Sequence, residues 1–249
     1  MMYVKEQADL EKMRKSGRIL KDLLDYISEQ VREGVTTKEL DTKAYDFITK
    51  HGATPSFKNY DGFPASLCIS IDDEVVHGIP SNRCLEEGML VKLDGGVYLD
   101  GFHTDAARTV IVGKTTEHKR KLAEVCKESF FVGIAKLKSG ARIGDYASAV
   151  QQYVESHNFS VVRELTGHGI GRNLHEDPMV PNYGIMGRGT RLARNLTLAL
   201  EPMINLGAMY VDEPDINDGW TIRTSDGLPS AHFENTVIIN DDGVEIITY

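Results

Sequence analysis

The stretch that most constrains the fold of this chain is residues 90–113, LVKLDGGVYLDGFHTDAARTVIVG. Asp100 and Gly101 form the two-residue signal that typically closes a β-hairpin, and both flanking arms favour strands. If these two residues make the turn, the register of the hairpin follows by counting outward from it. The predicted facing pairs are Leu99 with Phe102, Gly96 with Asp105, and Asp94 with Ala107.

This register places two carboxylates on one face of the hairpin. Side chains alternate along a strand, so Asp94 and Asp105 point the same way and become diagonal neighbours. One cation or a long polar group could bridge them, whereas burial of both charges without a cation or proton would be costly. An ordinary interpretation stays open, in which Asp94 belongs to an Asp-Gly turn and Asp105 is solvated at a strand edge.

The rest of the chain indicates two similar halves. The predicted helices cover residues 5–31, 34–52, 117–140 and 141–159, and the predicted strands cover residues 66–76, 88–112, 196–202 and 233–240. In both halves a glycine ends the first helix and an acid follows five residues later, Gly34 before Glu39 and Gly140 before Asp145. This order predicts an α+β fold, with a sheet covered on one face, in a single domain of residues 1–249.

Composition narrows the class of function. The chain has 28 Lys and Arg against 37 Asp and Glu, a net charge of −9, which disfavours sequence-independent nucleic-acid binding. No apolar run approaches membrane-spanning length, and the charged N-terminus is not a secretory signal. The cysteines show no paired spacing and predict reduced thiols in a cytoplasmic protein; they are Cys68, Cys84 and Cys126.

Residues 164–178, ELTGHGIGRNLHEDP, place His168 and His175 among three glycines. The spacing does not match GxGxxG, and no P-loop motif occurs, so a phosphate cradle is disfavoured. The glycines allow close backbone approach, which favours a functional site over a purely structural loop. The histidines interpreted as ordinary surface or core residues are His51, His103, His118, His157 and His232.

Two further acids lie beside predicted strands, Glu201 after an apolar run and Glu234 within one. A single acid in such a place is usually exposed, but four acids with His168 form a set of oxygen ligands and one imidazole. Such a set suits a pair of divalent metals, which activate water as a nucleophile at neutral pH. No GxSxG motif occurs, which leaves nucleophilic catalysis a weak alternative.

Taken together, the motifs resemble the methionine aminopeptidases, a family of dinuclear metallohydrolases. The matching stretches are CISIDDEVVHGIP (68–80), the Asp94–Asp105 hairpin, TGHGIGRNLHEDP (166–178), LEPMIN (200–205) and FENTV (233–237). The resemblance implies the pita-bread (creatinase/aminopeptidase) fold, in which two pseudo-twofold halves share a curved antiparallel sheet covered by helices. It also implies the short bacterial type I form, because the chain leaves no room for the type II insertion or for a zinc-finger extension.

The resemblance also implies two divalent metal ions per chain; cobalt, manganese, iron, zinc and nickel all suit such a site. The implied metal ligands are Asp94, Asp105, His168, Glu201 and Glu234, with Asp105 and Glu234 bridging. The implied catalytic residues are His77 and His175, which contact the substrate, and Glu201 as general base. The implied methionine pocket consists of Tyr60, Phe63, Cys68 and Trp220, with Phe57 and Leu174 nearby.

Three positions depart from the family pattern. Leu174 stands where an aromatic residue is common, which changes the pocket wall. Arg194 and Asn195 replace a frequent Pro-Gly turn before the Glu201 strand. Asn235 stands where a histidine often follows the bridging glutamate, which changes hydrogen bonding around the ligands. None of the three removes an implied ligand.

The resemblance implies removal of the initiator methionine from nascent polypeptides with a small second residue. The expected setting is the cytoplasm near the ribosome, with a monomeric enzyme and no nucleic-acid or membrane partner. Because the chain begins Met1-Met2 and methionine is too large for the second subsite, Met1 is expected to be retained. The alternatives are an X-Pro peptidase, whose relatives usually carry an extra N-terminal domain, and a non-catalytic pita-bread binding protein.

Overall fold

The computed structural model describes residues 3–249, with four long helices and many short strands. Met1 and Met2, on which the retention prediction rests, lie outside the described residues. The helices are α1 (Gln7–Gln30), α2 (Thr37–Lys50), α3 (Glu117–Ile134) and α4 (Ile143–Ser156), with a 3-10 turn η1 at Tyr60–Gly62. The strands are β1 (Thr54–Pro55), β2 (Leu67–Ile71), β3 (Glu74–Val76), β4 (Leu90–Leu99), β5 (Phe102–Ile111), β6 (Ser160–Val161), β7 (Gly167–Gly169), β8 (Glu176–Val180), β9 (Thr197–Leu200), β10 (Met203–Asn205), β11 (Ile222–Arg223), β12 (Ser230–His232), β13 (Glu234–Ile239) and β14 (Val244–Ile246).

The second helix of each half begins in the same way. At the start of α2, the Thr36 hydroxyl accepts a hydrogen bond from the Glu39 backbone at 3.2 Å, and the Glu39 carboxylate accepts one from the Thr36 backbone at 2.8 Å. At the start of α4, the Asp145 carboxylate accepts from the Arg142 backbone, also at 2.8 Å. These bonds satisfy N–H groups that the first turn of a helix leaves open. The acid that follows each glycine by five residues is therefore a helix-start residue in both halves.

One predicted helix was too long at its end. The pattern predicted helix to residue 140, whereas α3 ends at Ile134. Residues 135–141 form turns instead, closed by backbone bonds from Leu137 to Ile134 and from Ala141 to Lys138. Leu137 is buried there, so the apolar spacing continued after the helix had ended.

Most of the strands form one antiparallel sheet with the order β1-β4-β5-β13-β9-β7-β8, to which β2 adds on β4 and β14 adds on β13. Two smaller sheets have the orders β12-β10-β6 and β11-β3. The halves of the chain meet where β5 pairs with β13, with Ala107 opposite Glu234. This junction brings acids from distant parts of the sequence onto neighbouring strands.

Alternation along the hairpin separates the core from the site. Leu93 and Ala106 pack into an apolar cluster with Leu24 of α1, on the helix side of the sheet. Asp94 and Asp105 are the sequence neighbours of these core residues and therefore point to the opposite side. The apolar positions thus fix the hairpin against the helices and leave its acids on the other face.

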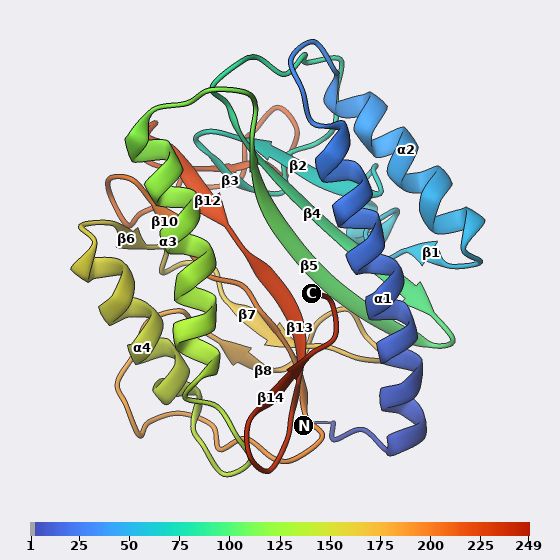
Figure 1. Ribbon diagram of the computed structural model, residues 1–249, viewed down its shortest axis with the longest axis vertical. Helices are drawn as coiled ribbons and strands as arrows, with labels where there is room; N and C mark the ends of the chain where they lie inside the picture. Colours follow the sequence, from blue (N-terminus) through green and yellow to red (C-terminus); the bar gives the residue numbers. More distant parts are fainter. Residues whose placement is uncertain (1–2) are drawn as a thin grey trace.

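The helices flank the sheet as two pairs (Figure 1). α1 and α2 lie beside one part of it and α3 and α4 beside the other, with β5 and β13 passing between the pairs. α1 packs on β4 and β5, while α3 packs on β5, β10 and β12. This arrangement confirms the prediction of an antiparallel sheet shared by two similar helix-covered halves.

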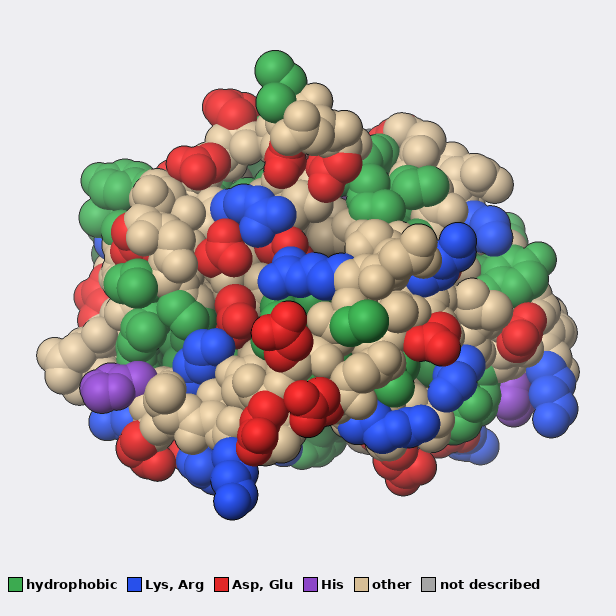
Figure 2. Space-filling model, turned by 90° about the horizontal axis from the view of Figure 1, so that it is seen from above, with side chains coloured by type: hydrophobic (Ala, Val, Ile, Leu, Met, Phe, Trp, Pro, Cys, Tyr) green, Lys and Arg blue, Asp and Glu red, His purple; other side chains and the backbone are tan. Residues whose placement is uncertain are grey.

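The surface carries charges of both signs. Figure 2 shows Lys and Arg side chains interspersed with Asp and Glu side chains across one face of the molecule.

Within residues 3–249, no helix combines the length and the apolar character needed to cross a membrane.

Candidate metal centre and substrate cavity

The Asp94–Asp105 hairpin has the predicted register. β4 and β5 pair Leu99 with Phe102, Gly96 with Asp105, and Asp94 with Ala107. Both acids are buried, at 8% exposure for Asp94 and 4% for Asp105. The alternative, in which Asp94 belongs to a turn and Asp105 is solvated at a strand edge, is therefore wrong.

A threonine from the other half fixes the backbone at Asp105. The hydroxyl of Thr236 on β13 accepts from the Asp105 backbone N–H at 2.9 Å and donates to the Asp105 carbonyl at 2.8 Å. Glu234 begins the same strand and is 2% exposed. The contact between β5 and β13 thus positions two of the four acids relative to each other.

The remaining ligand candidates come from the glycine-rich segment and the strand beside it. His168 lies on β7 opposite Ala199 of β9, and Glu201 directly follows β9. A Cβ added at Gly167 would lie 2.5 Å from the Ala199 carbonyl oxygen, too close for any side chain. Glycine is therefore required for β7 to approach β9, which brings His168 beside Glu201.

The orientation of His168 leaves one ring nitrogen for a ligand. Its Nδ1 bonds to the Gly169 carbonyl oxygen at 2.8 Å and must donate there, because a carbonyl only accepts. Nε2 then carries a lone pair and lies 3.6 Å from Oε1 of Glu201. Burial lowers the pKa of His168 to about 3, so the ring is neutral, as a metal ligand must be.

The four acids lie close together without a lysine or arginine partner in the described chain. Within the described chain, no lysine or arginine forms an ion pair with any of these four carboxylates. Burial raises the pKa of Asp94 to about 7 and that of Glu201 to about 8. Burial and the neighbouring acids raise the pKa values of Asp105 and Glu234 well above the ordinary range. The four carboxylates therefore repel one another when they are ionised.

This donor set fits divalent metal. One ligand atom each of Asp105, His168 and Glu234 lie within 4.8 Å of one another, and so do those of Glu201, His232 and Glu234. Among the described residues, Oδ1 of Asp94, Oδ1 of Asp105 and Oε1 of Glu234 are buried without a hydrogen-bond partner. Buried carboxylate oxygens need a proton or a cation, and a mixed oxygen and imidazole set suits divalent ions.

A small cavity of about 220 Å³ ends on these groups. It brings together every residue predicted for metal binding, catalysis or substrate binding, and also Asp61, which was not predicted. The cavity is lined by Phe57, Tyr60, Asp61, Phe63, Cys68, His77, Asp94, Asp105, His168, Leu174, His175, Glu201, Trp220 and Glu234. The residues predicted from the sequence therefore line one cavity.

The apolar end of the cavity has aromatic walls. The rings of Phe63 and Trp220 meet edge to face, with centroids 5.2 Å apart. Cys68 on β2 lies opposite Asp94 of β4 and is 5% exposed. Burial raises the pKa of the Cys68 thiol well above its ordinary value, so the sulfur is a neutral apolar wall atom and not a nucleophile.

Two further histidines face the same cavity. Nδ1 of His175 hydrogen-bonds to the Tyr60 hydroxyl at 2.9 Å, and burial lowers the pKa of His175. His77 follows β3 with a φ of +61°, which is uncommon outside glycine and often marks a functional position. Burial lowers the pKa of His77 to about 4. Both rings are therefore neutral at pH 7 and can donate or accept a hydrogen bond.

His232 is the residue that sequence reasoning placed wrongly. It was interpreted as an ordinary histidine, but its Nε2 lies 3.5 Å from Glu201 Oε2 and 4.0 Å from Glu234 Oε2. A signal was available: His232 precedes Glu234 by two residues, and residues two apart in extended chain share a face.

The three departures from the family pattern leave the site intact. Leu174 is 2% exposed and lines the cavity. Asn195 takes the left-handed conformation, with φ +64°, which asparagine tolerates, and thus replaces a turn glycine. Oδ1 of Asn235 accepts hydrogen bonds from Arg108 at 2.9 Å and Thr248 at 3.0 Å. Asn235 therefore supports the strand behind the acids.

Known proteins are similar to this chain in sequence and in fold. The sequence model of metallopeptidase family M24 matches residues 11–241. The methionine aminopeptidase of Clostridium perfringens is 52% identical over 248 residues, which cover 100% of this chain and 99% of that protein. The crystal structure of methionine aminopeptidase from Rickettsia prowazekii superimposes with a TM-score of 0.98 at 40% identity, covering 100% of both chains.

A more distant relation shows the fold alone. The prolidase from Pyrococcus furiosus has a TM-score of 0.79 at 22% identity, covering 99% of this chain and 65% of that chain. The pita-bread fold is therefore common to both groups, whereas high identity over the whole length is found with the methionine aminopeptidases. The chain belongs to metallopeptidase family M24 and, within it, to the type I methionine aminopeptidases.

Proposed function

We propose that this protein is a metal-dependent aminopeptidase that removes the N-terminal methionine from polypeptides whose second residue is small. The observation that carries the proposal is the cavity, whose lining joins residues of one apolar cluster to the four acids and three histidines. The 52% sequence identity with a methionine aminopeptidase over the whole chain supports the same activity. The fit of the donor set supports catalysis over a purely binding role.

Two divalent metals are the proposed cofactors. Asp94, Asp105, His168, Glu201 and Glu234 would hold the ions. The pairwise proximity of the ligand atoms and the unpartnered carboxylate oxygens support this assignment. When bound, such ions supply Lewis acidity and a water nucleophile at neutral pH. Cobalt, manganese, iron, zinc and nickel all suit these ligands.

Residues of the chain itself would transfer the proton and hydrogen-bond the scissile amide. Glu201 is the proposed base that takes a proton as water attacks the carbonyl carbon. The amide C–N bond then breaks, and the leaving nitrogen receives that proton to become the new N-terminal amine. Neutral His77 and His175 would hydrogen-bond the amide and the oxyanion, and the Tyr60 hydroxyl fixes the His175 ring.

The apolar end of the cavity is the proposed site for the methionine side chain. A flexible thioether packs well against the rings of Phe63 and Trp220 and the sulfur of Cys68. Such a pocket discriminates by size only modestly, because one methylene is worth roughly 1–3 kcal/mol. Norleucine and leucine peptides are therefore expected to be cleaved, but more slowly than methionine peptides.

The rest of the polypeptide needs a way out of the small cavity. A second hollow of about 590 Å³ shares His77, Asp94, His168, His175 and Glu201 with it. We assign this hollow to the residues that follow the scissile bond. Because it begins at the same histidines and acids, the chain can leave without crossing the methionine pocket.

The proposed substrates are the N-termini of nascent polypeptides near the ribosome in the cytoplasm, handled by a monomeric enzyme. The initiator methionine is first exposed in that setting, and the free cysteines Cys68, Cys84 and Cys126 are consistent with a reducing compartment. An N-terminal Met-Met sequence, as in this chain, is predicted to resist cleavage.

The decisive experiment is a peptide assay with metal-stripped protein that is then reloaded with one metal at a time. We expect release of free methionine from Met-Gly-type peptides only in the reloaded protein, with little release from Met-Met peptides. Peptides of the X-Pro class with other first residues serve as the competing substrates. Preferential cleavage of those peptides would favour an X-Pro peptidase, and no cleavage by any loaded form would favour a binding protein.

A further inference from the structure

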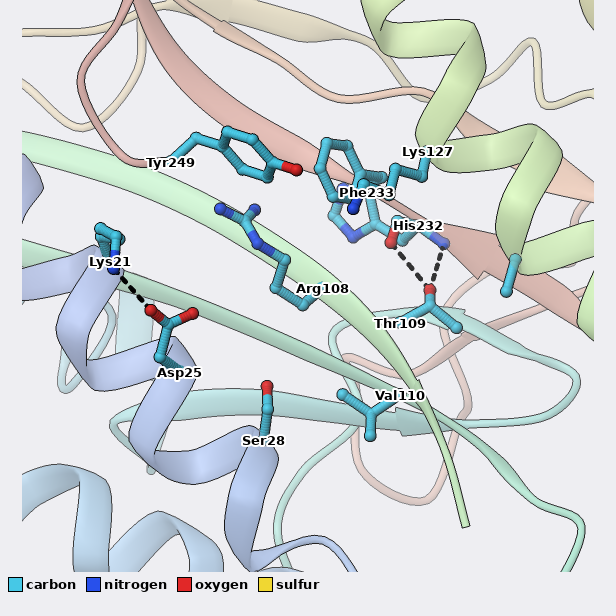
Figure 3. Close-up of a pocket in the computed structure, with 11 residues that line it drawn as sticks. Lys21, Asp25, Ser28, Arg108, Thr109, Val110, Lys127, His232, Phe233 and Tyr249 are labelled. Carbon is cyan, nitrogen blue, oxygen red and sulfur yellow. Dashed lines mark hydrogen bonds and ion pairs between the residues drawn. The ribbon is translucent and has the colours of Figure 1, made fainter. Parts of the chain in front are cut away.

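His232 is held in place by its backbone. It ends β12 opposite Met203, and the hydroxyl of Thr109 donates to its carbonyl at 2.8 Å and accepts from its N–H at 3.0 Å. Figure 3 shows this double contact and the His232 ring beside Phe233; both residues are part of the lining of the groove between α1 and α3. The backbone can therefore move little, and the ring is placed by the fold.

The ring is buried without a partner. His232 is 1% exposed, and neither ring nitrogen has a hydrogen-bond partner among residues 3–249. A buried polar group without a partner costs stability, so such a residue needs an explanation. Its Nε2 lies 3.5 Å from Oε2 of Glu201.

Glu201 thus lies between two histidines, of which His168 presents a lone pair to it and His232 can present an N–H donor. Oε1 faces Nε2 of His168, which carries a lone pair because Nδ1 of that ring donates to Gly169. Two lone-pair atoms attract only through a shared cation or a shared proton. Oε2 faces Nε2 of His232, whose ring has no competing bond and can carry its proton on Nε2.

We propose that His232 is a positioning residue, whose Nε2–H hydrogen-bonds to Oε2 of Glu201 and thereby holds Oε1 toward His168 and the metal they share. The inference rests on the proposed metal centre and deepens it. His232 then acts on the metal through Glu201, in the way that groups behind metal ligands commonly fix their orientation. The same bond would give Nε2 of the buried ring a partner.

Two substitutions separate this role from others. His232→Gln keeps an N–H donor of similar reach, whereas His232→Leu fills the space without one. His157→Gln is the matched control, because that ring bonds to the Tyr153 carbonyl at the end of α4. The dissociation constant for cobalt would be measured against a competing chelator, together with the visible absorption spectrum of the cobalt-loaded proteins. Circular dichroism would check that each variant folds.

We expect His232→Leu to weaken cobalt binding roughly 10–100-fold and to change the cobalt spectrum, the usual size of effect for a group behind a ligand. His232→Gln should stay within about threefold of the parent and keep its spectrum, as should His157→Gln. If the Leu variant binds as the parent does, the proposal is wrong.

Equal losses in the Leu and Gln variants, with equal spectral changes, would show that His232 ligates the metal directly and would overturn the positioning role. The positioning role is also overturned if His232→Leu fails to fold while His232→Gln folds and loses affinity for cobalt. A parent protein that binds no cobalt would instead overturn the metal centre itself, which distinguishes failure of the proposed function from failure of this inference.

Discussion

Two clusters of charged residues in this fold have opposite surroundings. The carboxylate cluster consists of Asp94, Asp105, Glu201 and Glu234. The ion-paired cluster consists of Asp73, Glu74, Arg83 and Arg223. In the second, Glu74 is 7% exposed and accepts hydrogen bonds from Arg83 at 2.9 Å, from Arg223 at 3.0 Å and from the Ile71 backbone at 2.7 Å.

The contrast teaches how to distinguish a structural acid from a ligand. A buried carboxylate needs positive charge or hydrogen-bond donors. The fold supplies both to Glu74: the Ile71 backbone at the end of β2 donates a hydrogen bond, and Arg83 and Arg223 supply the positive charge. It brings the carboxylate cluster together on β4, β5, β13 and the end of β9 without any lysine or arginine partner in the described chain. Missing counter-charge therefore marks the place where a cation belongs.

The largest expected effect comes from Asp105→Ala. Asp105 is a proposed metal ligand with a buried, unpartnered oxygen, so its loss should abolish metal uptake and methionine release together. Metal content by mass spectrometry and a Met-Gly-type peptide assay would check both. A variant that keeps full activity would break the comparison, because the cluster would then not need its acids as ligands.

His175→Ala should act on the reaction but not on the metal. The ring is a proposed donor to the scissile carbonyl, and loss of such a group typically lowers kcat by roughly 10²–10⁴-fold. Metal content should stay near that of the parent. If metal is lost along with activity, His175 belongs to the ligand set and its assignment to the substrate is wrong.

Glu74→Gln sharpens the comparison from the other side. The amide keeps the shape but loses the charge that holds Arg83 and Arg223, so the free energy of unfolding should fall by about 1–3 kcal/mol. Denaturant unfolding would measure this change. Metal content and kcat should be unchanged, because Glu74 faces protein cations. A selective loss of metal would show that the two clusters are not independent.

Asp41→Asn should have the smallest effect. Oδ1 of Asp41 accepts from the backbones of Ser66 at 2.8 Å and Leu67 at 2.9 Å, and an amide oxygen can accept both bonds. Burial raises the pKa of Asp41, so the folded state holds this proton more tightly than the unfolded state. The parent therefore loses stability relative to the variant as pH rises from below 3.8 through the folded pKa.

Unfolding of both proteins from pH 3 to 7 would test the sign. We expect the difference to be near zero in acid, where Asp41 is protonated and resembles asparagine, and to favour the variant by less than about 1 kcal/mol at neutral pH. A difference that favours the parent at pH 7 would mean that the Asp41 charge stabilises the start of β2.

Local patterns predicted the parts of the site that lie within one turn or strand. The Asp100-Gly101 turn fixed the register of β4 and β5, and counting from it paired Gly96 with Asp105. The glycines around His168 correctly indicated close backbone contact. By contrast, His232 was missed because the residue type and its mixed segment do not by themselves show what the ring will face. Only the alternation with Glu234 pointed to it.

What the sequence determined by itself is therefore the hairpin, the helix starts and, through resemblance, the identity of the ligand candidates, because turn chemistry, capping and alternation act between residues close in the chain. What the tertiary structure decided is which charges meet. Glu234 reaches Asp105 only because β13 pairs with β5, and Glu201 lies between His168 and His232 only because β7, β9 and β12 come together there. Those contacts depend on the packing of the helix pairs against a shared sheet, so the balance of buried charge is a property of the whole fold.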